Sequence, residues 1–428
     1  MKNEMYFYNI YPRLINVGKE TLITIEPLLP SRAEFNSETE YQIEILPMTR
    51  YSRVFNQSPD NKIVLKGENN KLQFKYVFDK EEEYLVKILK KEGNALIVQL
   101  AVYALEDDLY KRRPLKGDLH IHSIRSDGGE GPAVVAAKYR EAGFDFMGLT
   151  DHGTYTASVE AIDAYKDVEL GMLLFNGEEV HSPENFVHVV NFGGKSSINE
   201  IFQKDQNLYY KEVNEIIETE DIPYEEDKFI YAANLWVSRK IREAGGLSIF
   251  AHPHWHFPVN NVPDDLSTAF FKNDVFDAFE VIGGYSFTHE NNMQTAFYYT
   301  ALANGLKIPI VGSSDSHGTI NGSYFPRQYT IVFADEYNQD SVLQSIKDYY
   351  SVAVENYHDS AEYTVHGNYR FVAYASFLIE NYFVFTAQFC AEDGLLMQQY
   401  ILGVPGAKER LNEIKTRSAD YYKLCSGR

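Results

Sequence analysis

The chain has 428 residues, of which 44% are hydrophobic, so it is long enough for two or three domains with sizeable cores. Its 61 acidic and 40 basic residues give a formal charge of −21, which disfavours non-specific binding of DNA or RNA because the phosphate backbone would be repelled. An anionic substrate is still allowed, since bound divalent cations can reverse the sign of the field inside one pocket.

The cysteine content and the apolar segments favour a cytoplasmic protein. Cys390 and Cys425 are too few for a disulfide framework and lack zinc-finger spacing. The N-terminal segment has no apolar core leading to a small-residue cleavage site, so no signal peptide is expected. The apolar residues 371–390 carry Glu380, Asn381 and Gln388, which predicts a buried helix and no membrane span.

Residues 1–110 are predicted to form an all-β domain. Short runs alternate apolar and polar side chains over residues 21–29, 41–48, 62–67, 72–78, 83–89 and 95–105. Many short strands at this spacing are typical of an antiparallel sandwich of the immunoglobulin-like kind. No histidine precedes His120, so metal chemistry is not expected in this domain.

Residues 111–356 alternate helical stretches with short apolar runs, which indicates α/β architecture. One unit occurs three times: a helix closed by glycine (AAKYREAG, SRKIREAGG and TALANG), an apolar strand, and then a residue able to bind metal. The three strands lead to His152, to His252, and to Asp315 with His317. Because sites are built at the carboxyl ends of parallel strands, we expect these residues to meet.

Two further segments complete the predicted organisation. Residues 196–235 are an insertion with a helical piece and an acidic loop, interpreted as a solvated surface excursion, with a lid over the site as the alternative. Residues 357–428 are predicted to be a helical, aromatic C-terminal extension that packs on the catalytic domain.

The strongest functional signal is the segment GDLHIHS. Residues two apart on a strand face the same side, so His120 and His122 can bind one metal, and Asp127 follows on a turn as an oxygen ligand. The further candidates are His152, Glu179, His188, His252, Asp315 and His317. Imidazole and carboxylate without thiolate suit zinc, manganese or iron. Nine candidates exceed what one ion can use, which predicts two or three divalent ions sharing a bridging carboxylate.

The chain resembles the polymerase-and-histidinol-phosphatase (PHP) family of phosphoesterases. The segments that carry the resemblance are, in order, GDLHIHSIRSDG, GLTDHG, GEEV, VHVVNFG, IFAHPH and GSSDSHG. The resemblance covers residues 114–356, a little over half of the chain. It implies a distorted (β/α)7 barrel with a trinuclear metal site.

The resemblance also implies a role for each ligand. One metal is held by His120, His122, Glu179 and Asp315, a second by Glu179, His188 and His252, and a third by Asp127, His152 and His317. The family spacing Gly-x-Glu selects Glu179 over Glu178 as the bridging carboxylate. A water held between two cations about 3.5–4 Å apart loses its proton near neutral pH, so a metal-bridging hydroxide is the expected nucleophile.

The residues that contact substrate are less clearly marked. Arg125 and Arg327 are candidates for a bidentate phosphate clamp, with solvated arginines as the alternative reading. His254, and less so His256, can line the pocket or donate a proton to the leaving group. The remaining histidines are interpreted as ordinary ones: His181, His289, His358 and His366.

Three functions are compatible with this pattern. The first is a metal-dependent phosphoesterase that hydrolyses a small phosphorylated metabolite or nucleotide. The second keeps the metals but cleaves carbamate, ester or amide bonds. The third is a binding or regulatory protein with an inactive site, against which the complete set of nine ligands argues. Arginines aimed at the metals would favour phosphate, and an apolar aromatic wall would favour a neutral ester.

Overall fold

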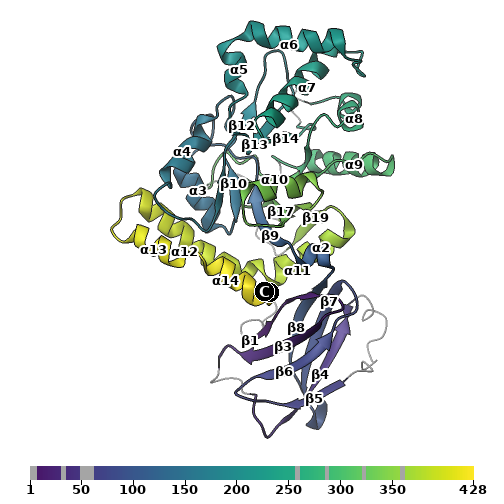
Figure 1. Cartoon of the computed structure of the whole chain (residues 1–428), viewed down its shortest axis with the longest axis vertical. Coiled ribbons are helices and arrows are strands. Elements are labelled where there is room, and N and C mark those ends of the chain that lie inside the picture. The colour runs from purple at the N-terminus through teal and green to yellow at the C-terminus, as the bar shows by residue number, and fades with distance from the viewer. Residues whose placement is uncertain are drawn as a thin grey trace. The chain divides into compact units, whose positions relative to one another are not determined.

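The computed structural model describes residues 7–29, 35–48, 62–255, 261–284, 289–320, 324–356 and 362–428. These residues form a mixed α/β structure with several sheets (Figure 1). The chain divides into two compact units. The first contains Met1–Arg112, Ala373–Thr386 and Thr416–Arg428, and the second contains Arg113–Val372 and Ala387–Lys415.

The first unit is built on two sheets that share one core. The smaller sheet has the order β1 (Tyr8–Tyr11), β3 (Glu20–Pro27) and β6 (Leu72–Val77), and the larger has the order β2 (Leu14–Asn16), β8 (Leu96–Leu105), β7 (Glu82–Lys90), β4 (Glu40–Pro47) and β5 (Lys62–Lys66). Ile25 of the smaller sheet and Val86 and Val102 of the larger are fully buried in this core. The six predicted strands are confirmed, and the immunoglobulin-like topology stays a prediction.

The second unit contains the other two sheets. One has the order β11 (Leu173–Phe175), β10 (Phe146–Gly148), β9 (Arg113–Asp118), β17 (Gln328–Ala334), β18 (Ser351–Asn356) and β19 (Tyr363–His366). The other has the order β12 (Gly177–Val180), β13 (Val189–Phe192), β14 (Leu247–Phe250), β15 (Ala278–Ile282) and β16 (Ile310–Gly312). Every residue of β12 to β16 is buried, as in strands that are covered on both faces.

Helices cover the second of these sheets on one face, and side chains from both sheets fill the space on the other. The helices of this region are α3 (Pro132–Glu141), α4 (Thr156–Ala164), α5 (Asn199–Lys204), α6 (Gln206–Thr219), α7 (Lys228–Glu243), α8 (Asp264–Lys272), α9 (His289–Ala303) and α10 (Gln339–Lys347). Trp236 of α7 and Phe270 of α8 share a buried cluster with Phe250. A second cluster joins Phe146 and Ile249, one from each sheet.

The three predicted helix–glycine–strand units are present. Gly143, Gly245 and Gly305 follow α3, α7 and α9 with φ of 90°, 78° and 81°, the left-handed conformation expected of a helix C-cap. Two isolated parallel bridges, Ile121 with Ser316 and His152 with Glu179, join segments of the two sheets. Both bridges fall within the predicted metal-binding motifs. The assignment of these sheets to a distorted (β/α)7 barrel stays a prediction.

The insertion and the C-terminal residues are mainly helical. Residues 196–235 contain α5, α6 and the start of α7, and α6 buries Tyr209 and Val213 in the core that it shares with α7. The tail forms α11 (Tyr369–Asn381), α12 (Phe383–Ile401), α13 (Ala407–Ile414) and α14 (Arg417–Ser426). The domain boundaries given by the sequence stay a prediction.

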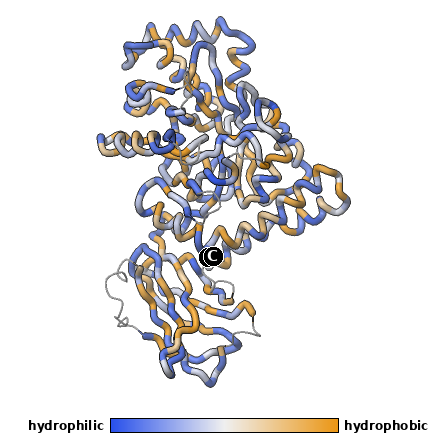
Figure 2. Tube along the Cα trace, turned by 180° about the vertical axis from the view of Figure 1, so that it is seen from behind, coloured by the Kyte–Doolittle hydropathy of each residue, from blue (hydrophilic) through white to orange (hydrophobic). Residues whose placement is uncertain are grey.

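The buried helix predicted for the apolar residues 371–390 needs correction. They do not form a single buried helix, because α11 ends at Asn381 and α12 begins at Phe383. Figure 2 shows hydrophobic and hydrophilic residues interspersed along the chain. Among the described residues, no helix is long and apolar enough to cross a bilayer.

Candidate metal centre

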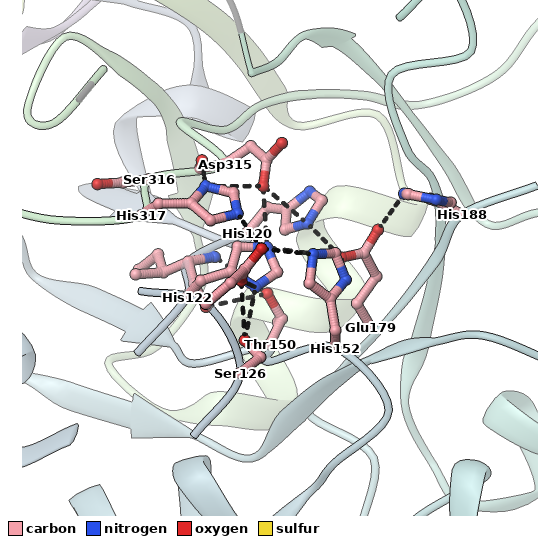
Figure 3. Close-up of polar contacts among 12 residues, drawn as sticks. His120, His122, Ser126, Thr150, His152, Glu179, His188, Asp315, Ser316 and His317 are labelled. Carbon is pink, nitrogen blue, oxygen red and sulfur yellow. Dashed lines mark hydrogen bonds and ion pairs between the residues drawn. The ribbon is translucent and has the colours of Figure 1, made fainter. Parts of the chain in front are cut away.

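The nine predicted ligands come together in the second unit (Figure 3). Their donor atoms fall into groups in which all atoms lie within 4.8 Å of one another. Most follow a strand end: His152 follows β10, His252 follows β14, and Asp315 follows β16. The expectation that His120 and His122 lie on a strand needs correction, because β9 ends at Asp118.

The first donor set, His120, His122, Glu179 and Asp315, has the spacing of a metal site. Glu179 Oε2 lies 3.3 Å from His120 Nε2 and 3.5 Å from His122 Nε2. Asp315 Oδ1 lies 3.4 Å from His120 Nε2 and 2.9 Å from His122 Nε2. Four ligands placed tetrahedrally at zinc bond lengths lie about 3.3–3.6 Å from one another. The four printed distances, 2.9–3.5 Å, are thus close to the spacing of ligands around one divalent cation.

The second donor set, Glu179, His188 and His252, uses the other oxygen of the same glutamate. Glu179 Oε1 lies 2.6 Å from His188 Nδ1 and 3.7 Å from His252 Nε2. Oε2 faces the first donor set and also lies 2.7 Å from His152 Nδ1, whereas Oε1 faces the second donor set, so this one carboxylate lies between the sets. The neighbouring carboxylate of Glu178 is instead satisfied within the protein. Its oxygens accept hydrogen bonds from Asn191 Nδ2 and Asn199 Nδ2.

The third donor set, Asp127, His152 and His317, lies on the solvent side of the cluster. Asp127 Oδ2 is 3.5 Å from His152 Nε2 and 3.3 Å from His317 Nε2. The Asp127 side chain is 54% exposed, whereas those of His120, His122 and Glu179 are fully buried. A substrate can therefore approach the cluster from the side of the third donor set.

The cluster holds buried lone pairs that the protein leaves without hydrogen bonds. Within the described residues, the atoms with no hydrogen-bond partner include His120 Nε2, His122 Nε2, both oxygens of Glu179, His188 Nδ1 and Asp315 Oδ1. Buried polar atoms are normally satisfied, so such a concentration calls for a group that accepts their electron pairs. Divalent cations in the first and second donor sets would satisfy these atoms, so the chemistry of the donors fits metal binding.

Proximity within the cluster shifts its pKa values in opposite directions. Burial opposes the charge on His120, but Asp315, Glu179 and Glu280 outweigh it and raise the His120 pKa well above its ordinary value. For His152, burial likewise lowers the pKa while Glu179 raises it, with a result of about 9. Burial dominates for His188 and lowers its pKa to about 4, so this ring is neutral near pH 7.

The carboxylates of the first donor set remain ionised. Burial by itself would raise the pKa of Glu179, but His188, His120 and His152 lower it well below its ordinary value. The pKa of Asp315 is lowered in the same way, against burial, by His120 and His122. Protons on histidines thus balance these negative charges, and a cation that replaces those protons restores the same balance.

Two ligands have strained backbones. His252 has φ of 25° and Asp315 has φ of 48°, values that non-glycine residues seldom adopt. Such conformations cost about 1–3 kcal/mol each and persist only where the surrounding structure enforces them. Their coincidence with the cluster supports a functional reason for the placement of these side chains.

Two buried aspartates outside the donor sets fix the segments that carry the ligands. Asp118 accepts hydrogen bonds from Ser314 N and Tyr139 Oη, which ties the end of β9 to the segment before Asp315. Burial raises the pKa of Asp118 to about 7. Asp151 accepts from Ser123 N and Ser123 Oγ and so holds the turn that leads to Asp127.

The predicted substrate-binding residues have other partners. Arg125 Nε lies 2.7 Å from Glu160 Oε2 in a half-exposed ion pair. Arg327 is half-buried near Tyr324, whose pKa is raised by burial and by Asp315. His254 Nε2 lies 3.2 Å from Asp264 Oδ1, and its ring is buried. The roles assigned to these residues stay predictions.

Sequence reasoning missed two residues of the cluster. His181, interpreted above as an ordinary histidine, lies with Nε2 2.8 Å from His152 Nδ1 and forms a further candidate group with His152 and Glu179. Its position two residues after Glu179 was the available signal. Glu280 lies with Oε2 3.0 Å from His120 Nδ1. In the sequence, Glu280 could have been noticed as a carboxylate within the apolar run AFEVI. The remaining candidates His256 and His358 lie outside the described residues.

No protein-family model and no curated protein matches the chain. Solved structures with a distant likeness include a two-domain protein from Bacteroides vulgatus that contains a predicted PHP-like metal-dependent phosphoesterase (19% identity, TM-score 0.41). The match covers 57% of this chain and 65% of that protein, so the chain spans less than two thirds of its length.

Two further solved structures show a weaker likeness. A candidate metal-dependent phosphoesterase from Bifidobacterium adolescentis is 20% identical, with TM-score 0.34 and coverage of 48% of this chain and 90% of that chain. An amidohydrolase from Chromobacterium violaceum is 18% identical, with TM-score 0.32 and coverage of 47% and 87%. PHP-like proteins, which the motifs resemble, are thus among the structural neighbours.

Proposed function

We propose that the chain is a metal-dependent hydrolase and that its substrate is a small phosphorylated metabolite or nucleotide. The observation that carries the proposal is the bridging position of Glu179, whose two oxygens face two separate donor sets. Two cations that share a carboxylate form the arrangement by which many phosphatases and nucleases act. Zinc, manganese and iron are the metals that the donor atoms suit.

The protein's own residues would bind and orient the reactants. When bound, divalent cations supply Lewis acidity that activates water and offsets negative charge on a phosphoryl group. The first donor set, which is buried, would hold a cation away from competing solvent. The third donor set, which is partly exposed, would hold a cation that a phosphate from solvent could reach. The net charge of −21 would disfavour binding of phosphate to the rest of the protein on average.

Two observations favour a second candidate, the hydrolysis of an ester, amide or carbamate. Trp255 is half-exposed and lies against the rings of His188 and His252, with centroid distances of 5.6 and 5.5 Å. It provides an aromatic surface beside the second donor set. Arg125 is engaged by Glu160. An aromatic wall beside the second donor set suits a neutral substrate.

One experiment separates the two candidates. Metal-analysed protein is assayed on p-nitrophenyl phosphate, bis-p-nitrophenyl phosphate and p-nitrophenyl acetate, with His120→Ala alongside. We expect turnover of a phosphate ester that is lost in the variant. Turnover of acetate alone, also lost in the variant, would replace the phosphate assignment with the second candidate. Absence of bound metal after loading would contradict both.

A further inference from the structure

Glu280 is a buried carboxylate that lies against His120, one of the proposed metal ligands. It lies in β15 with no exposed surface, and its Oε2 is 3.0 Å from His120 Nδ1. Its Oε1 has no hydrogen-bond partner among the described residues. An ionised carboxylate is costly in such surroundings unless a donor or an opposite charge compensates it. The compensation available here is His120.

The two ring nitrogens of His120 face different groups. Nε2 points to Glu179 and Asp315 in the first donor set, and Nδ1 points to Glu280. A neutral imidazole that binds a metal through Nε2 carries its proton on Nδ1, where it can donate to a carboxylate. Glu280 accepts that hydrogen bond and so selects the ring tautomer that leaves Nε2 free.

The backbone after β15 is shaped around this carboxylate. A Cβ atom on Gly283 would lie 1.8 Å from Glu280 Oε1 and 2.4 Å from its carboxyl carbon. The Gly283 N–H donates to Asn291 Oδ1, which fixes the glycine in place. The next residue, Gly284, has φ of 67°, and a Cβ there would lie 3.2 Å from Asp315 Oδ2. Two successive glycines therefore allow the chain to pass close to both carboxylates.

We propose that Glu280 is a positioning residue, which holds His120 with its proton on Nδ1 so that Nε2 is presented to the cation of the first donor set. The inference rests on the proposed function, because it requires that this set binds a metal. Partners of this type fix ring orientation and raise ligand basicity, and their loss typically weakens metal binding about 10–100-fold.

The test measures metal binding directly. Zn²⁺ affinity is determined by competition with a chromophoric chelator for the wild-type chain, Glu280→Leu and Glu280→Gln. We expect Glu280→Leu to bind its tightest Zn²⁺ about 10–100-fold more weakly. We expect Glu280→Gln to lie between Glu280→Leu and the wild type, since an amide oxygen still accepts from Nδ1–H without the charge. Gly283→Ala, whose added methyl group would displace the carboxylate, should reproduce the loss while leaving Glu280 intact.

A second readout separates positioning from simple packing. The melting temperature of each variant is measured after chelation and again with Zn²⁺. A positioning role reduces the increase in melting temperature that Zn²⁺ produces, because that increase depends on affinity. The matched control is Glu178→Gln. Glu178 is equally buried but bonded to Asn191 and Asn199, so its loss should lower both melting temperatures and leave their difference unchanged.

The outcomes are distinguishable. Wild-type Zn²⁺ affinity in both Glu280 variants would overturn the inference and leave the proposed function intact. Equal lowering of the melting temperature with and without Zn²⁺, as in the control, would also overturn it and assign Glu280 to packing. A wild-type chain that binds no Zn²⁺ would overturn the proposed function itself, and the inference with it.

Discussion

Two buried charged clusters of the second unit show opposite ways of placing charge in a protein interior. In one, the Arg140 guanidinium donates through Nε and Nη2 to Asp393 Oδ2 and through Nη1 to Phe144 O. In the other, the metal-ligand cluster, both oxygens of Glu179 and the inward nitrogens of His120 and His122 lack hydrogen bonds. The side chains of Arg140 and Asp393 in the first cluster and of Glu179, His120 and His122 in the second are all buried.

The difference teaches how a structural cluster can be told from a functional one. A structural ion pair is complete within the chain, because each donor finds an acceptor. A metal site keeps electron pairs uncommitted and tolerates strain, here at His252 and Asp315, since the missing partner comes from outside. Burial alone does not distinguish the two clusters, whereas the count of unsatisfied atoms does.

The largest expected effect is on catalysis. Removal of metal by a chelator should abolish hydrolysis, and His122→Ala should lower kcat/KM by about 10³-fold, because metal ions contribute several kcal/mol of transition-state stabilisation. The measurement is steady-state hydrolysis before and after chelation and reloading. His366→Ala serves as the matched control, since this ring lies in β19 beside Tyr299 and outside the donor sets. Full activity after verified metal removal would contradict the proposal.

Breaking the structural cluster should affect stability and not metal dependence. Asp393→Ala leaves Arg140 buried without its main partner, which should cost about 3–5 kcal/mol of unfolding free energy. Urea unfolding, followed with and without Zn²⁺, measures the loss. We expect the same decrease in both conditions. A decrease confined to the metal-loaded protein would mean that the two clusters are not independent.

The pH dependence of the metal-free protein gives a smaller effect. The pKa of His152 is raised to about 9 in the folded protein, compared with about 6.5 in the unfolded chain. The charged ring therefore stabilises the folded state. This contribution is fully present below pH 6.5 and is lost as the pH rises through 9. We expect a loss of about 1–2 kcal/mol over this window, reduced by solvent at the partly exposed ring. The free energy of unfolding is measured with urea after metal has been removed by a chelator. The His152→Ala variant should lack the pH-dependent contribution under these conditions. An unchanged pH profile in the variant would contradict the assignment.

The smallest effect is expected at Arg125. Its half-exposed ion pair with Glu160 should contribute at most about 1 kcal/mol to stability. If the side chain stays with Glu160, Arg125→Ala should change KM for a phosphate ester by less than about twofold, which corresponds to about 0.4 kcal/mol. A tenfold rise in KM for phosphate, with KM for acetate unchanged, would instead support the phosphate clamp.

The sequence predicted much of the site because its ligands occur in a repeated local context. A glycine-closed helix, an apolar strand and a ligand recur three times, so His152, His252 and Asp315 could be expected to meet before any coordinates were known. Six strands of the first unit, β3 to β8, followed from alternation of apolar and polar residues. Both signals are local in sequence, which is why they could be read without a structure.

The rest depended on contacts between distant segments. Glu280 belongs to no motif, and only the packing of β15 against the segment after β9 brings it to His120. The orientation of Arg125 toward Glu160 is a choice of side-chain partner that spacing does not determine. The break between α11 and α12 was likewise not expected, because no glycine or proline occurs in residues 371–390.

The wide spacing of the ligands along the chain has a consequence for how the centre is assembled. His120 is synthesised early and His317 much later, with most of the second unit between them. An unfolded chain cannot hold these donors together, so, if the proposed function is correct, cation capture would follow or accompany folding of this unit. Metal content in a purified sample would then report what fraction of molecules has reached the native state.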